Sequence, residues 1–114
     1  MREPFLEKIE QRALVCDGAM GTMLYAKGIG LGRCFDELNL VMPHLVKEVH
    51  LSYAKAGADV LETNTFGANR FRLGKFELGH KVREINLVGA HLARQVAGDD
   101  LYVAGSVGPL GLRL

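Results

Sequence analysis

The sequence has almost no net charge and no long apolar segment. Its 14 basic and 13 acidic side chains leave a formal charge of +1, so the overall charge gives no reason to expect nucleic acid as a partner. No run of eighteen or more apolar residues occurs, which argues against a membrane-spanning helix. The N-terminal stretch Met-Arg-Glu-Pro-Phe-Leu-Glu-Lys carries charges where a signal peptide would be apolar. We therefore expect a cytoplasmic protein that binds neither nucleic acid nor membrane.

Cysteine is also scarce, and the two cysteines lie far apart. Cys16 falls in an apolar run and Cys34 in an expected loop, so they form neither a C-x-x-C pair nor the spacing of a zinc site. We expect both thiols to be reduced. The four histidines do not cluster. His80 and His91 share one expected helix, where their separation is a rise of roughly 16 Å, too far for one metal ion. These residues predict no metal site.

What the sequence does have is a regular alternation of expected strands and helices. The 114 residues are 48% hydrophobic, typical of one small globular domain, which we place at residues 1–114. Runs of apolar residues predict strands, and apolar residues at helical spacing predict helices. We expect strands at 14–16, 59–63 and 101–107, and helices at 3–12, 43–57 and 77–97. This order favours an α/β fold with right-handed crossovers and a parallel sheet.

The expected sheet looks unfinished. Three parallel strands with two crossover helices leave both edges and one face of the sheet uncovered. A complete (β/α)8 TIM barrel takes about 250 residues. We therefore interpret the chain as the first three β/α units of such a barrel, incomplete as given. The helix at 3–12 carries Phe5, Leu6 and Ile9 on one face and is expected to cover the start of the barrel or sheet.

Small or polar residues follow each expected strand. Asp17 and Gly18 follow the first strand, the segment from Glu62 to Thr65 follows the second, and Ser106 lies near the end of the third. The carboxyl ends of parallel strands meet on one rim, where the active sites of such barrels lie. In addition, the turn at Gly18, Ala19 and Met20 opens a helix, where backbone N–H groups are unpaired. We expect one shared substrate site on this rim.

Each of these residues also has a purely structural interpretation. Asp17 is equally suited to cap the helix that follows it, and Asn64 or Thr65 to cap a later turn. Glu62 lies on the strand face opposite Leu61, and a buried acid needs a partner, for which Arg70 or Arg72 is a candidate. The basic stretch 70–75 reads as a solvated loop, with contact to a folate tail or phosphate as the alternative.

No catalytic side chain can be assigned from these motifs. The segment around Ser106 lacks the G-x-S-x-G spacing, and no histidine or acid is placed to activate the serine. Gly28, Gly30 and Gly32 follow a helical turn rather than a strand, which favours a flexible connector over a phosphate-binding loop.

The motifs do resemble a known family. The segments LVCDGAMGTMLYAKGI, RCFDELNL, AGADVLETNTFGANR, EINLVGAHLAR and VAGSVGPLG resemble, in this order, the N-terminal part of the homocysteine-binding S-methyltransferase domain. RCFDELNL and the AGSVGPLG ending look closest to the bifunctional type that is fused to a methylenetetrahydrofolate reductase, which makes a fused reductase domain a possible partner.

The resemblance implies a zinc-dependent barrel that transfers a methyl group to the thiolate of homocysteine and releases methionine. In the family, three cysteines on later strands hold the zinc, and neither Cys16 nor Cys34 matches them. We therefore expect this piece to be inactive alone and to need the remainder of its own barrel. The resemblance implies that its contribution is homocysteine binding, by Asp17, Gly18, Ala19, Met20, Glu62, Asn64, Thr65 and Ser106.

The methyl donor is left open. Methyltetrahydrofolate through cobalamin, S-methylmethionine, S-adenosylmethionine and betaine are all used within the family. A second interpretation, from another functional class, is a non-catalytic module that binds an amino acid or associates with itself through its exposed strand edges.

Overall fold

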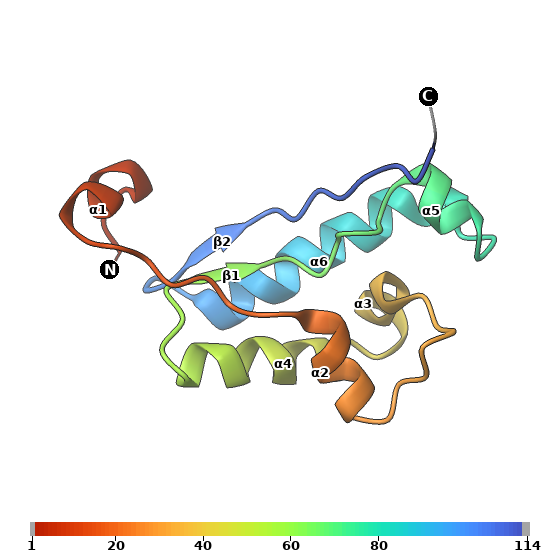
Figure 1. Ribbon diagram of the computed structural model, residues 1–114, viewed down its shortest axis with the longest axis horizontal. Coiled ribbons are helices and arrows are strands. Elements are labelled where there is room, and N and C mark those ends of the chain that lie inside the picture. Colours follow the sequence, from red (N-terminus) through yellow and green to blue (C-terminus); the bar gives the residue numbers. More distant parts are fainter. Residues whose placement is uncertain (1, 113–114) are drawn as a thin grey trace.

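The computed structural model describes residues 2–112, which form a layer of helices against a small parallel sheet (Figure 1). In chain order the helices before the first strand are α1 (Phe5–Gln11), α2 (Met20–Ala26), the 3-10 turn η1 (Phe35–Glu37), α3 (Leu38–Val41) and α4 (Pro43–Lys55). Then follow β1 (Val60–Glu62), α5 (Arg70–Gly74), the 3-10 turn η2 (Gly79–Lys81), α6 (Val82–Ala97) and β2 (Tyr102–Ala104).

The sheet is parallel, as predicted, but smaller than predicted. β1 pairs with β2 in a register that places Leu61 opposite Val103, and the expected first strand is reduced to one parallel bridge between Cys16 and Val60. The cause lies in Asp59, whose side-chain carboxylate accepts the Val15 N–H at 2.9 Å and also pairs with Arg12 at 2.9 Å. Because this N–H is bonded to a side chain, a regular ladder does not form over residues 14–16.

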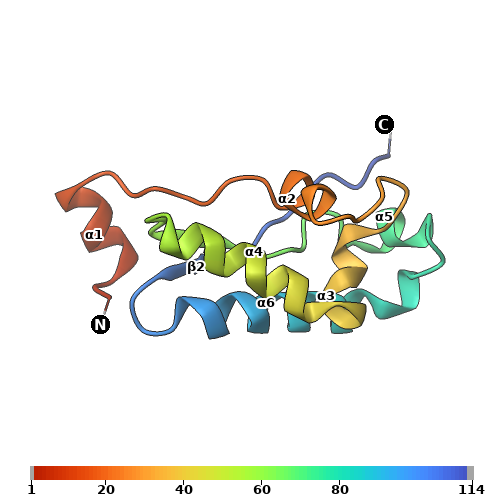
Figure 2. The same ribbon diagram turned by 90° about the horizontal axis from the view of Figure 1, so that it is seen from below.

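Helices α4 and α6 lie side by side and pack on one face of the sheet (Figures 1 and 2). Leu61 is fully buried beneath them with Ala58 and Ala97. A second apolar cluster, between α2, α3, α4 and α6, contains Leu24, Leu38, Val46, Val49 and Leu92. Apolar periodicity predicted the buried faces of the two long helices in part: Val46, Val49, Ile85 and Leu92 are buried. Ala56, expected on the same face, is exposed.

The start of α6 is later than predicted. Residues 77–81 do not continue the helix, because Glu77 takes a left-handed φ of 62° and the chain then makes the turn η2 before α6 begins at Val82. A left-handed residue cannot lie inside an α-helix. The end at Gly98 is as predicted, with a φ of 57° that favours glycine.

The basic stretch 70–75 was expected to be a loop, and that expectation is wrong. Residues Arg70–Gly74 form α5, which is capped by the Asn69 side chain accepting the N–H groups of Phe71 and Arg72 at 3.1 and 2.9 Å. Leu73 anchors this helix in the core with no exposed surface. A side-chain cap and one buried anchor are enough to stabilise so short a helix.

Helix α1 covers part of the other face of the sheet. Phe5 contacts Tyr102 edge to face, with 5.4 Å between ring centroids, and the Tyr102 hydroxyl donates to the Glu3 carbonyl. Figure 1 shows α1 apart from α4 and α6, beside the start of the sheet. An apolar groove remains between α1 and the strands, lined by residues that include Ile9, Cys16 and Val60. Among residues 2–112, no helix is long and apolar enough to cross a bilayer.

Candidate functional site

A cleft of about 510 Å³ opens at the carboxyl end of the sheet. Its lining contains all the predicted site residues except Thr65: Asp17, Gly18, Ala19, Met20, Glu62, Asn64 and Ser106. The residues after the strands, which were predicted to share one rim, therefore line one cleft, apart from Thr65.

Asp17 is held at the edge of the cleft by the backbone of β1. Its own N–H donates to Val60 O at 2.9 Å, and both carboxylate oxygens accept the Glu62 N–H at 3.1 Å. Burial raises the pKa of this carboxyl, and the nearby Glu62 charge adds to the rise, while the hydrogen bond from Glu62 N–H opposes it. A partly buried acid beside a second acid is a favourable place for a cationic group.

Asp17 does not cap the following helix. The N-cap of α2 is Ala19, which makes no side-chain cap, so the cap interpretation of Asp17 is wrong. Asn64 and Thr65 are not caps of α5 either, because Asn69 has that role.

The turn after Asp17 rests on Tyr53 of α4. The Tyr53 hydroxyl donates to Ala19 O at 2.8 Å, and a β-carbon placed on Gly18 would lie 2.8 Å from the same hydroxyl oxygen. Only glycine fits in that space. Burial and the nearby Asp17 charge raise the pKa of Tyr53, which keeps the hydroxyl protonated as a donor.

Hydroxyl groups tie the end of β1 to the end of β2. The side chains of Thr63 and Thr65 share a hydrogen bond of 2.6 Å. Thr65 Oγ1 donates to Ser106 O at 2.8 Å, and Ser106 N donates to Thr63 Oγ1 at 3.0 Å. Thr65 is buried behind the rim and holds Ser106 in place rather than lining the cleft.

The suggested ion pair of Glu62 with Arg70 or Arg72 is not found. Among the described residues Glu62 is exposed and forms no salt bridge, and the Arg70 guanidinium lies 5.0 Å from the centre of the Phe71 ring. The Glu62 carboxylate therefore remains available beside Asp17.

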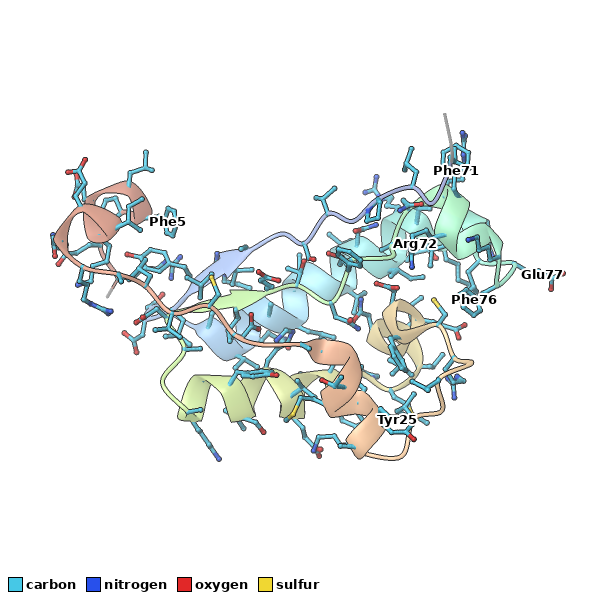
Figure 3. All side chains as sticks on the ribbon, viewed as in Figure 1. Phe5, Tyr25, Phe71, Arg72, Phe76 and Glu77 are labelled. Atoms are coloured by element: carbon cyan, nitrogen blue, oxygen red, sulfur yellow. The ribbon has the colours of Figure 1, made fainter. Side chains whose placement is uncertain are left out.

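The sequence did not predict Asp36 as a cleft residue. This side chain, from η1, accepts the Gly67 N–H at 3.2 Å. Burial raises the pKa of its carboxyl, an effect that hydrogen bonding to Gly67 and the charge of Arg72 oppose. Arg72 and Phe76 also line the cleft, extending from α5 and the turn after it toward α3, whereas Phe71 points away (Figure 3). Asp36 follows no strand, so the only available signal for it was the acid in the DELNL segment itself.

The residues present do not fit a zinc site. No three histidine, cysteine or acidic side chains within residues 2–112 come close enough to hold a metal ion. Cys34 lines the cleft, but burial raises the pKa of its thiol and so disfavours the thiolate that binds metal. Cys16 lies on the apolar groove beneath α1.

Comparison with known proteins identifies relatives over nearly the whole chain. A sequence model of the homocysteine S-methyltransferase family matches residues 14–114. Methionine synthase from Mycobacterium tuberculosis is 40% identical over 117 residues, covering 91% of this chain and 10% of the relative. The protein of the same name from Mycobacterium leprae is 41% identical with the same coverage.

A solved structure gives the same relationship in three dimensions. The metallated form of the homocysteine methyltransferase MmuM from Escherichia coli superimposes with a TM-score of 0.81 at 29% identity, over 96% of this chain. The chain spans 42% of that protein and about a tenth of the curated methionine synthases.

Proposed function

This chain belongs to the homocysteine S-methyltransferase family, and we propose that it supplies the amino-acid-binding part of a site that methylates homocysteine on sulfur to give methionine. The observation that carries the proposal is the cleft, because Asp17, Glu62 and Asn64 meet there at the carboxyl ends of parallel strands. A substrate site is expected at this end of the sheet in parallel α/β proteins.

The two ends of the amino acid have complementary groups in the cleft. The ammonium group of homocysteine binds beside the Asp17 and Glu62 carboxylates, where a positive charge offsets the burial and the Glu62 charge that raise the Asp17 pKa. The substrate carboxylate binds near the backbone N–H groups of the Gly18–Met20 turn. Ser106 and the aromatic side chains of Phe35 and Phe66 line the remainder of the cleft.

The reaction joins the homocysteine sulfur to a methyl carbon while the bond from that carbon to its donor breaks. The attacking species is the thiolate, because a free thiol with a pKa of about 8.5 is mostly protonated at neutral pH. Activation of the sulfur falls outside the groups present in residues 2–112, which offer no metal-ligand set. As the family resemblance implies, zinc held by the remainder of the barrel would supply this activation.

The donor stays unassigned among methyltetrahydrofolate through cobalamin, S-methylmethionine, S-adenosylmethionine and betaine. A fused reductase domain, implied by the resemblance of RCFDELNL and AGSVGPLG, belongs to the same proposal.

Zinc content and homocysteine-dependent methionine formation test the proposal together. Both are measured on residues 1–114 and on the product of the complete reading frame that encodes them. The proposal expects zinc and turnover in the complete product and neither in residues 1–114. If the complete product forms no methionine from homocysteine with any of the four donors, the proposal is wrong.

One observation favours the non-catalytic alternative. Among residues 2–112, β2 pairs only with β1, so its outer edge is free to pair with another chain. A complete product that binds homocysteine, holds no zinc and self-associates would support that alternative.

A further inference from the structure

Asn39 of α3 is completely buried and does not line the cleft. Its amide nitrogen donates to Asn64 O at 2.8 Å and to Ile85 O at 3.1 Å. Both of its N–H groups are therefore used on backbone carbonyls, one at the end of β1 and one in α6. Because a carbonyl oxygen can only accept, the amide of Asn39 has one possible orientation.

This orientation determines that of Asn64. Asn39 Oδ1 accepts a hydrogen bond from Asn64 Nδ2 at 3.1 Å, and the same nitrogen donates to Phe35 O at 2.9 Å. A flipped Asn64 amide would place its oxygen against the Asn39 oxygen and the Phe35 carbonyl, which repel it. Three backbone carbonyls, those of Asn64, Ile85 and Phe35, thus fix both amides.

One polar atom remains free in this network. Among residues 2–112, Asn64 Oδ1 has no hydrogen-bond partner, yet it is not a buried unsatisfied atom, and Asn64 lines the cleft. Asn64 therefore presents an oxygen, and not an N–H group, to a ligand.

The space around the Asn39 amide leaves no freedom to rearrange. A β-carbon on Gly89 of α6 would lie 2.7 Å from Asn39 Nδ2 and 2.8 Å from Thr65 Cγ2. Because Gly89 has no side chain, α6 lies close to the Asn39 amide, and this close packing holds the amide in its hydrogen-bonding position.

We propose that Asn39 is a positioning residue that holds the Asn64 amide with its oxygen toward the cleft, where that oxygen accepts a hydrogen bond from the ammonium group of the substrate. This rests on the proposed function. An ammonium group has three N–H donors and no acceptor. The Asp17 and Glu62 carboxylates and the Asn64 oxygen offer it acceptors, whereas an Asn64 N–H facing the cleft would repel it.

The test compares homocysteine with 4-mercaptobutanoate, which has the same thiol and carboxylate but lacks the amino group. Titration calorimetry on the complete reading-frame product gives the ratio of their dissociation constants. Asn39→Asp replaces the Asn39 N–H donor by a carboxylate oxygen, which removes the hydrogen bonds to Asn64 O and Ile85 O and disturbs the Asn64 amide. Gly89→Ala pushes on the Asn39 amide without removing a polar group, and Asn64→Ala removes the oxygen directly.

We expect the preference for homocysteine to fall about tenfold or more in all three variants, the usual effect of losing one hydrogen bond to a charged group. Ile85→Val is the matched control, because it loosens packing in α6 beside the network but leaves every amide and carbonyl in place. It should keep the wild-type ratio, which separates positioning from general destabilisation.

Variants that keep the wild-type ratio would overturn the inference while leaving the proposed function intact. A wild-type protein that binds both compounds equally would overturn the inference together with the assignment of the cleft to the substrate ammonium group. Should Asn39→Asp fail to fold, Gly89→Ala and Asn64→Ala decide. A wild-type protein that binds neither compound would overturn the proposed function itself, and the inference with it.

Discussion

At the scale of single residues, the shape of the cleft floor depends on the contact between Gly18 and Tyr53. The Tyr53 hydroxyl supports the turn by donating to Ala19 O and at the same time occupies the space of a Gly18 side chain. The turn that carries Asp17 into the cleft is thus fixed from α4, a different element from the one that contains it.

Gly18→Ala should distort this turn. Its β-carbon would lie 2.8 Å from the Tyr53 hydroxyl oxygen and 3.1 Å from the ring, and such overpacking typically costs about 1–3 kcal/mol. We expect weaker homocysteine binding and a lower free energy of unfolding, measured by calorimetry and urea denaturation.

Tyr53→Phe provides the control for Gly18→Ala. Removing the hydroxyl relieves the closest contact, so the double variant should be less destabilised than the sum of the single variants. Strictly additive effects would show that the two residues do not interact as described.

Residues after a strand were correctly predicted to line the cleft, apart from Thr65, whereas cleft residues from other elements were not predicted. Asp17, Glu62 and Asn64 were predictable because strand exits converge in a parallel sheet. Asn39 and Asp36 were not, because they come from α3 and η1, which are too short to show a hydrophobic period. Their roles arise from contacts with residues 25 to 46 positions away, which no local pattern encodes.

At the scale of elements, α4 contains a buried polar residue without a partner. His50 is fully buried, and neither ring nitrogen has a hydrogen bond in the described part of the chain. Burial lowers the pKa of His50 from 6.5 to about 4. The neutral ring is compatible with the core, and the charged ring is not.

The stability of the protein should therefore fall as the pH drops from 6.5 toward 4. In this range the unfolded state binds a proton at His50 and the folded state does not, so protonation favours unfolding. The expected loss from this residue is about 2 kcal/mol between pH 7 and pH 5. His50→Leu should remove it.

Urea denaturation of the wild type and His50→Leu at both pH values measures this effect. Because all other titrating groups are common to the two proteins, the difference in their pH dependence isolates His50. Parallel loss of stability in the two proteins would show that His50 is not buried as described.

Whether the sequence predicted a helix depended on its length, because long helices were predicted and the shortest ones were not. The long helices α4 and α6 have several turns of apolar periodicity, which tertiary contacts then confirm. By contrast, α3 and α5 have four and five residues and depend on a cap or a single buried leucine. The expected first strand does not form because the Asp59 side chain accepts the Val15 N–H, which would otherwise bond along the sheet. The alternation of apolar residues in the sequence does not indicate such a side-chain bond.

At the scale of the whole molecule, the surface is larger than that of a compact monomer. The solvent-accessible surface is 7178 Å², whereas a 12.5 kDa globular protein has about 6,200 Å². The radius of gyration is 14.6 Å, against about 13 Å expected for this length. The edge of β2 that pairs with no strand among residues 2–112 and the apolar groove beneath α1 are both part of this surface.

Residues 1–114 alone should therefore self-associate. Exposed apolar side chains include Leu6, Phe66 and Val107, the last 91% exposed, and a free strand edge favours pairing between chains. Sedimentation velocity at increasing concentration should show species larger than a monomer.

Val107→Lys should weaken this association, because it replaces an exposed apolar side chain shortly after β2 by a charged one. If residues 1–114 stay monomeric over the whole concentration range, this account of their surface is contradicted.

The affinity of the complete reading-frame product for homocysteine, compared between the wild type and Asp17→Asn, tests the central claim most directly. Loss of the charge should weaken binding about tenfold or more. The free energy of unfolding should change by less than about 0.5 kcal/mol, because burial already disfavours the ionised form of Asp17 and the amide oxygen still accepts the Glu62 N–H. Equal affinity in the two proteins would contradict the assignment of this cleft to the substrate amino group.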